Sequence, residues 1–308
     1  MPSSPVAQLR GILPIAPTPF HDNGDLDIDG KRRVLDCMID QGVDGLCILA
    51  NYSEQFLLSD DERRTLTRLC LEHVAGRVPT IVTCSHFATQ IVVDRCREAA
   101  ALGAAMIMLM PPYHGAALKG TPQGIFEQFS AAAKAGLPIM VQDAPLAGIE
   151  LPVPLLVRLT KEIEEVAYFK IETPAAAAKL RALIAAGGDV IEGPFDGEEG
   201  ITLMADLDAG ATGTMTSALL PDLIKPIVEA HVAGDREAAM AGYANVLPLI
   251  NYENRQCGLR ACKTVMMQGG VIGSDHVRHP MPQLPREARE GLLELARQHD
   301  LVALRWGK

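Results

Sequence analysis

Short apolar runs alternate with longer amphipathic segments along most of the chain. Eight apolar runs can be counted, and they begin at Gly11, Val43, Pro79, Ala104, Leu137, Val166, Asp189 and Ala211. The segments between them, such as 60–74, 88–102, 121–135 and 174–186, carry apolar residues at helical spacing and charged residues on the opposite face. Strands that alternate with helices indicate a parallel sheet, and eight apolar strands predict a closed (β/α)8 TIM barrel that is covered on both sides.

The alternation stops after Pro221, and the tail from about residue 235 has a helical pattern that is interrupted by the stretch "GGVIGSDHVRHPMPQLP". We therefore predict a barrel domain over residues 1–233 and a C-terminal helical appendage over residues 234–308. The alternative is an open doubly wound sheet. The barrel is favoured because no GxGxxG turn opens the first strand-helix unit.

Composition narrows the class of ligand. The chain has 308 residues, of which 48% are hydrophobic and 21% charged, with a formal net charge of -10. A large core is therefore available. Binding to nucleic acid is disfavoured because no cluster of Lys and Arg is present, and no apolar run has the length that a membrane span requires. A small-molecule ligand is expected, and the N-terminus lacks the layout of a signal peptide, which indicates a cytoplasmic protein.

Seven cysteines are present, an odd number, and none forms a CxxC pair. This pattern is typical of reduced thiols in the core and does not indicate disulfides or a zinc site. Neither a metal nor a cofactor is expected.

The most unusual residue at a strand end is Lys170, which closes the run "VAYFK". Lysine is among the residues least often buried, and the active sites of such barrels lie at the C-terminal ends of the strands. A structural ion pair with Glu172 or Glu54 would explain the residue. The functional interpretation is a desolvated amine of lowered pKa that condenses with a ketone to form a Schiff base.

Polar residues also follow three other predicted strands. The second is followed by "ANYSEQ" at 50–55, the fourth by "PPYHG" at 111–115, and the fifth ends in "QDAP" at 142–145. Each has a structural explanation, because Asn51 and Ser53 could cap a helix, Tyr113 could pack and His114 could face solvent. In a barrel, however, all three motifs would converge on one rim.

Together with the opening "GILPIAPTPF", the lysine strand "FKIET" and the late segment "RHPMPQL", these motifs resemble the superfamily of dihydrodipicolinate synthase and N-acetylneuraminate lyase, over nearly the whole chain. Its members are class I, Schiff-base-forming aldolases, lyases and dehydratases. The resemblance implies that Lys170 is the Schiff-base lysine and that the protein is a homotetramer, a dimer of dimers. It also implies that the loop 51–54 and Gly193 hold a 2-oxo acid, whose carboxylate would be bound by backbone N–H and hydroxyl groups of Tyr52 and Ser53.

The chain departs from this superfamily at informative positions. Gln142 replaces the tyrosine that relays protons in the synthases and aldolases, and an amide cannot give up and recover a proton near neutral pH. Asn51 and Tyr52 replace the usual hydroxyl pair, and "QDAPLAG" lacks the arginine that serves the second substrate of the synthases. These departures argue against the synthase reaction.

A reaction on a single 2-oxo acid remains, since an iminium at C2 acidifies the C3 protons and allows a hydroxyl at C4 to leave. The pattern is similar to that of 2-keto-3-deoxy sugar acid dehydratases. This similarity implies L-2-keto-3-deoxyarabonate as the substrate and 2-oxoglutarate semialdehyde as the product.

Roles can be assigned as expectations. Lys170 would be the nucleophile, Gln142 would orient a water or a substrate hydroxyl, and the candidate acids and bases are Glu54, Tyr113 and His114. A second polar cluster, 196–199 with Thr214, Thr216 and Ser217, would either recognise the distal hydroxyls or place acids at a helix N-terminus.

Three alternatives stay open at this point. A pyruvate-releasing aldolase or lyase would share Lys170 and the fold. A non-catalytic 2-oxo acid binding protein could use the same scaffold. A metal-dependent barrel enzyme is disfavoured, because the strand ends offer only the isolated histidines His86 and His114.

Overall fold

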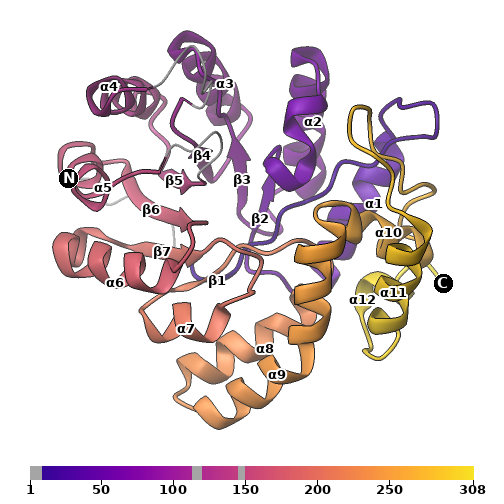
Figure 1. The fold of residues 1–308 in the computed structure, drawn as a ribbon. Helices are drawn as coiled ribbons and strands as arrows, with labels where there is room; N and C mark the ends of the chain where they lie inside the picture. The colour runs from indigo at the N-terminus through magenta and orange to yellow at the C-terminus, as the bar shows by residue number, and fades with distance from the viewer. Residues whose placement is uncertain (1–8, 113–119, 145–149) are drawn as a thin grey trace.

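The structure is a computed structural model that describes residues 9–112, 120–144 and 150–308. Its parallel sheet has the strand order β1-β8-β7-β6-β5-β4-β3-β2 (Figure 1). The strands are β1 Gly11–Ile12, β2 Leu46–Ile48, β3 Thr80–Thr83, β4 Met106–Leu109, β5 Ile139–Asp143, β6 Val166–Ile171, β7 Gly193–Asp196 and β8 Gly213–Thr214.

Backbone hydrogen bonds join the first two strands just beyond β1 and so close the ring. The Ala16 N–H donates to the Cys47 carbonyl at 2.8 Å, and the Cys47 N–H donates to the Pro14 carbonyl at 2.9 Å. The predicted (β/α)8 barrel is therefore confirmed. The prolines of "LPIAPTP" shorten β1, because proline has no N–H to donate to a neighbouring strand.

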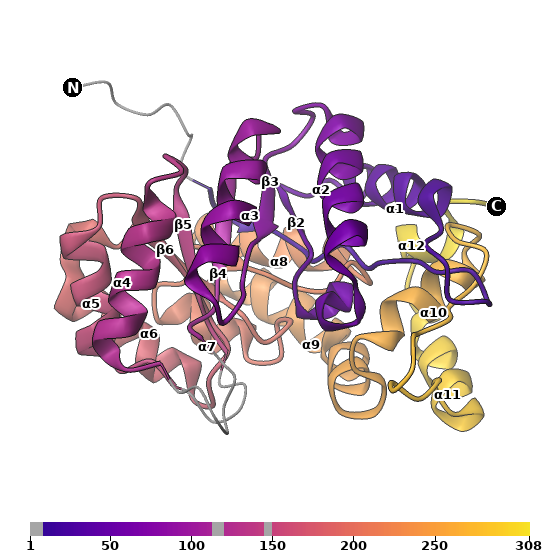
Figure 2. The ribbon, with the colours of Figure 1, turned by 90° about the horizontal axis from the view of Figure 1, so that it is seen from above.

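Eight helices follow the strands and surround the barrel (Figures 1 and 2). Their starts carry the expected signals: Ser59 and Glu62 form a capping box at α2, and Thr121 caps α4 ahead of Pro122. The helices are α1 Ile28–Asp40, α2 Asp60–Val74, α3 Thr89–Ala101, α4 Pro122–Ala133, α5 Val153–Glu162, α6 Ala176–Gly187, α7 Leu203–Asp208 and α8 Pro221–Val232.

The core has two parts because strand residues alternate between the two faces of the sheet. One cluster fills the barrel and includes Met106, Met140, Tyr168, Phe195 and Met215. The larger cluster lies between the strands and the surrounding helices. All seven cysteines are buried free thiols, as the sequence predicted.

The C-terminal segment is helical, as predicted. It contains α9 Arg236–Tyr252, a π-helical turn η5 Glu253–Cys257, α10 Arg260–Gln268, α11 Arg286–Ala296 and α12 Val302–Arg305. α9 lies against α8, while α12 lies beside α1, where Trp306 Nε1 donates to Asp40 at 2.7 Å (Figure 1). That this C-terminal segment forms a domain separate from the barrel stays a prediction.

No helix in the described part of the chain combines the length and the apolarity needed to cross a membrane.

Candidate active site

Lys170 lies on β6, and its side chain is buried at 2% relative exposure. By strand alternation it shares the inner face of the barrel with Tyr168, while Phe169 and Ile171 pack outward. Its Nζ donates to the Gly197 carbonyl at 2.9 Å and forms an ion pair with Glu172. The amine is therefore held at the C-terminal end of the barrel, where the sequence placed it.

Glu172 lies two residues after the lysine and so projects toward the same side. Gln142, the partner of Lys170 in the register of β5 and β6, donates from Nε2 to Glu172 Oε1 at 2.7 Å. One carboxylate oxygen thus receives both an amide and an ammonium group. The superfamily pattern leads us to expect a tyrosine at this position. This chain has Gln142 there, and its amide holds the Glu172 carboxylate next to the amine.

The expected lowering of the lysine pKa is wrong for the ligand-free protein. Burial does lower the pKa of Lys170, but the charges of Glu172 and Glu199 outweigh it, and Asp196 adds to them, so that the pKa is raised. Burial disfavours an ammonium group, whereas nearby carboxylates favour it. Lys170 therefore rests as an ammonium whose proton has an acceptor in direct contact.

Glu199 and Tyr52 form the second part of the site. Burial raises the pKa of Glu199 well above its usual value, and Glu172 and Glu253 raise it further. Its side chain is hydrogen-bonded to Tyr52, whose own pKa is raised by burial and by the charge of Glu199. The Lys170 ammonium acts in the opposite direction on Glu199, so Glu199 is a buried acid of raised pKa that lies between the Tyr52 phenol and the charged lysine.

Glu253 adds a further buried acid from the opposite end of the sequence. It begins η5 and is bonded to Ser217, which lies beyond β8, and burial raises its pKa to about 7. Sequence reasoning missed this residue, because it stands alone within a long helical stretch and has no motif around it. Glu172 was considered only as an ion-pair partner, although its two-residue spacing from the lysine predicts that both face the same way.

The turn η1, Asn51–Ser53, is tied to the segment after β1. Ser53 Oγ donates to the Ala16 carbonyl at 2.7 Å, and its N–H donates to the Ala50 carbonyl at 2.9 Å. The Asn51 carboxamide oxygen accepts from Gln55 Nε2 at 2.7 Å. Of the three residues, Tyr52 is the one whose side chain reaches the group around Lys170.

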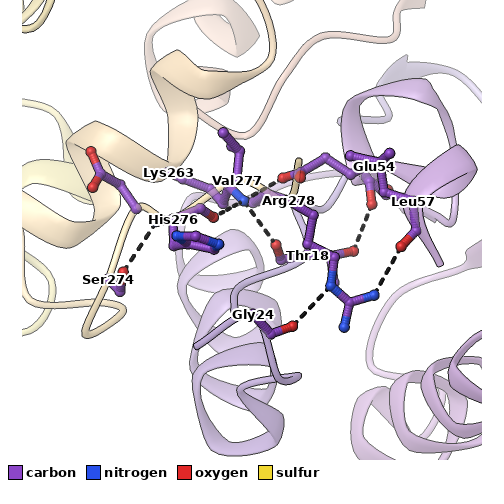
Figure 3. A network of polar contacts seen from close by, with 12 residues as sticks. Thr18, Gly24, Glu54, Leu57, Lys263, Ser274, His276, Val277 and Arg278 are labelled. Carbon is purple, nitrogen blue, oxygen red and sulfur yellow. Dashed lines mark hydrogen bonds and ion pairs between the residues drawn. The ribbon is translucent and has the colours of Figure 1, made fainter. Parts of the chain in front are cut away.

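Glu54 was predicted to act as an acid or base near Lys170, but it is paired with another residue. Its carboxylate forms an ion pair with Lys263 of α10, and both side chains are buried (Figure 3). The carboxylate thus faces the C-terminal segment and not Lys170.

Two other predicted residues lie away from the amine. Gly193 is in register with Tyr168 at the start of β7, and a Cβ there would come within 2.3 Å of the tyrosine ring. Thr214 donates to Asp196, which is also bonded to Asp206 of α7, so this pair faces the helix layer. The glycine beside Lys170 is Gly197. Tyr113 and His114 lie outside the described residues.

The described residues contain no group of three or more His, Cys, Asp or Glu side chains arranged to hold a metal ion.

Residues 8–299 match the dihydrodipicolinate synthetase family. The chain belongs to this family. The resemblance inferred from the motifs is thereby confirmed.

Comparison with individual proteins shows which members of the family the chain is similar to. It is 56% identical, over 99% of both chains, to the L-2-keto-3-deoxyarabonate dehydratase of Azospirillum brasilense. It is 30% identical to 4-hydroxy-tetrahydrodipicolinate synthase 2 of Streptomyces coelicolor, over 96% of this chain and 97% of that protein. The crystal structure of a dihydrodipicolinate synthase from Bacillus anthracis superimposes with a TM-score of 0.87 at 23% identity, covering 94% and 98% of the two chains, and shows the shared fold.

Proposed function

We propose that this member of the dihydrodipicolinate synthetase family is a hydro-lyase that dehydrates a 2-keto-3-deoxy sugar acid through a Schiff base on Lys170. Its substrate is L-2-keto-3-deoxyarabonate, and its product is 2-oxoglutarate semialdehyde. The observation that carries this proposal is the 56% identity to a dehydratase of that substrate over 99% of both chains. The buried lysine with its paired carboxylate supports the chemistry.

The first step is imine formation. Lys170 passes a proton to Glu172, the carboxylate in contact with Nζ, and the neutral amine attacks C2 of the substrate. Protonated Glu172 then gives its proton to the carbinolamine hydroxyl, which leaves as water, so that an iminium forms and Glu172 is a carboxylate again. Gln142 keeps the Glu172 carboxylate in place through its 2.7 Å hydrogen bond, so that the proton acceptor is fixed before the substrate arrives.

Elimination follows from the electron-withdrawing iminium. Glu172 removes a proton from C3, the C3 electrons form an enamine, and the C4–O bond breaks. Glu199 is buried and has a raised pKa, so we assign it as the acid that donates the proton with which the hydroxyl departs as water. A proton shift from C5 to C3 gives an enol across C4 and C5. The enol takes a proton at C4 and loses its hydroxyl proton to become the C5 aldehyde, and hydrolysis of the imine releases the semialdehyde and restores the amine.

We place the substrate carboxylate at the turn η1. Ser53 already uses both its hydroxyl and its N–H within the protein, so Tyr52 is the residue of the expected pair that serves the ligand. Ser217 and Glu253 are buried and hydrogen-bonded to each other, and we assign them to the distal hydroxyl.

The test is incubation of the purified protein with L-2-keto-3-deoxyarabonate beside a Lys170→Ala control. An NADP-dependent aldehyde dehydrogenase reads the semialdehyde, and lactate dehydrogenase reads pyruvate. Semialdehyde without pyruvate, lost in the variant, is expected. Pyruvate would make the protein an aldolase. Borohydride trapping of pyruvate without turnover of the sugar acid would favour a 2-oxo acid binding protein.

Two further proposals concern its state in the cell. We propose a homotetramer, supported by the family resemblance alone, which sedimentation equilibrium would test. A cytoplasmic location is supported by the seven free thiols and would be tested by cell fractionation.

A further inference from the structure

One ammonium group connects three segments that are far apart in the sequence. Lys263 of α10 is fully buried, and its Nζ forms an ion pair with Glu54, after β2. It also donates to the Thr18 carbonyl at 3.3 Å, after β1, and to the His276 carbonyl of the C-terminal segment. Figure 3 shows Lys263 with Glu54, Thr18 and His276 grouped around it.

The segment after β1 and the turn after β2, which both contact Lys263, are also joined to each other by hydrogen bonds. Thr18 Oγ1 donates to the Ser53 carbonyl at 2.8 Å, and Ser53 Oγ donates to the Ala16 carbonyl at 2.7 Å. Glu54 ends the turn η1 in a left-handed conformation with φ of 58°, which a residue other than glycine adopts only when its surroundings impose it. The ion pair with Lys263 is a contact that imposes it.

Because both members of this ion pair are buried, separating them would cost a large free energy. Glu54 is 2% exposed and Lys263 0%. The Phe20 ring lies 4.8 Å from the lysine nitrogen and excludes water from that side. A buried charge without its partner is strongly unfavourable, so each member of the pair holds the other in position.

The turn that this pair anchors carries Tyr52 toward Glu199, beside Lys170. The described contacts of Lys263 include neither Glu199 nor Lys170; they are with Glu54, two carbonyl groups and Phe20, and the charge of Asp275 acts on it as well. Its influence on the reaction must therefore act through the position of the turn.

We propose that Lys263 is a positioning residue for the turn Asn51–Ser53, through which α10 of the C-terminal segment sets the geometry of the carboxylate end of the substrate site. This inference rests on the proposed function, because that function places the substrate carboxylate at the turn.

The test uses the full chain and a pair of compensating substitutions. Lys263→Met alone leaves Glu54 charged and buried, and can fail to fold. The double variant Glu54→Gln, Lys263→Met removes both charges, so it retains the fold while it loses the anchor. Arg286→Met is the control, since it breaks an ion pair of the same C-terminal segment, with Glu290 of α11, which shares no partner with Lys263.

Hydrogen–deuterium exchange measures the protection of the backbone amides of the turn, and it requires no ligand. Peptides covering residues 50–58 of the double variant are expected to exchange about tenfold faster or more than in the parent, whereas Arg286→Met leaves them protected. Unchanged exchange in the double variant would overturn the proposal. Because this measurement involves no substrate, failure of the parent to dehydrate the sugar acid would count against the proposed function alone.

The functional consequence is a split between KM and kcat. KM for L-2-keto-3-deoxyarabonate is expected to rise about tenfold in the double variant, with kcat changed by about threefold or less. The pyruvate concentration that gives half-maximal borohydride trapping is expected to rise similarly. An unchanged KM and unchanged half-maximal pyruvate, or a loss in kcat alone, would contradict a positioning role.

Discussion

Lys170 and Lys263 are both buried lysines that pair with a glutamate and donate to backbone carbonyls, yet their surroundings differ. Near Lys170, the charges of Glu172, Glu199 and Asp196 together outweigh burial and raise its pKa. At Lys263, burial prevails over the attraction of Glu54, and its pKa is lowered.

Burial of a lysine therefore does not identify a reactive amine. Lys170 has several acids nearby: Glu172 is in contact with its nitrogen, and Glu199 has a raised pKa that suits a proton donor. Lys263 has one carboxylate in contact, a neighbouring aromatic ring and two carbonyls, which suit an anchor. The distinction between the reactive and the anchoring lysine rests on the number of neighbouring acids.

The largest expected effect is that of Lys170→Ala. It should lower kcat by about 10⁴-fold or more, because the covalent intermediate can no longer form. The coupled assay for semialdehyde measures it, and intact mass after borohydride with pyruvate should show no adduct. An adduct that persists in this variant but disappears in the Glu54→Gln, Lys263→Met protein would reverse the assignment of the two lysines.

Glu172→Gln should come next, with kcat lowered about 10²- to 10³-fold, because the base that takes the lysine proton is removed while the shape is kept. The same change removes the foremost of the charges that raise the Lys170 pKa. The pH profile of imine formation should therefore shift to lower pH. A profile that stays in place would show that Glu172 does not set the state of the amine.

Glu253→Gln tests how a buried acid of the site changes the free energy of unfolding with pH. Its folded pKa of about 7 lies above its usual value of 4.5, so the folded state binds more protons than the unfolded state between these values. Stability of the parent is thus lost as pH rises through this window. The variant should be more stable than the parent by about 3 kcal/mol near pH 8 and nearly equal to it near pH 4.5. Urea unfolding at the two pH values measures the difference.

Lys31→Met should have the smallest effect. Lys31 is also buried, with its pKa lowered by burial, and it donates to the Pro17 carbonyl at 2.7 Å. Its loss removes hydrogen bonds but also a costly buried charge, so the free energy of unfolding should change by about 1 kcal/mol or less. A loss as large as that expected for Lys263→Met alone would show that bonds to carbonyls, and not a paired carboxylate, make a lysine an anchor.

The sequence predicted the barrel because eight apolar runs alternate with amphipathic helices, and that pattern depends on burial, which a single chain records directly. It also placed Lys170 and Gln142 correctly on neighbouring strands. The length of β1 was not predictable from hydrophobicity, since prolines in an apolar run interrupt the hydrogen-bond ladder while leaving the pattern intact.

The site was predicted less completely than the fold. Glu253 reaches it from a helical segment near the C-terminus, and Glu54 turns toward Lys263 of the same segment. Both outcomes depend on how that segment packs against the barrel, and local sequence carries no signal for such long-range contacts. Gly193 and Gly197 lie four positions apart on one strand-loop unit, and only the register of β6 with β7 shows which one adjoins the lysine.

The most direct measurement is intact mass, with peptide mapping, of the parent protein treated with cyanoborohydride in the presence of L-2-keto-3-deoxyarabonate. A dehydrated five-carbon adduct on the peptide that contains Lys170 is the predicted result. A three-carbon pyruvate adduct on that peptide would replace dehydration by carbon–carbon cleavage. An adduct on Lys263 or Lys31, or none under conditions of turnover, would contradict the assignment of Lys170 as the reacting amine.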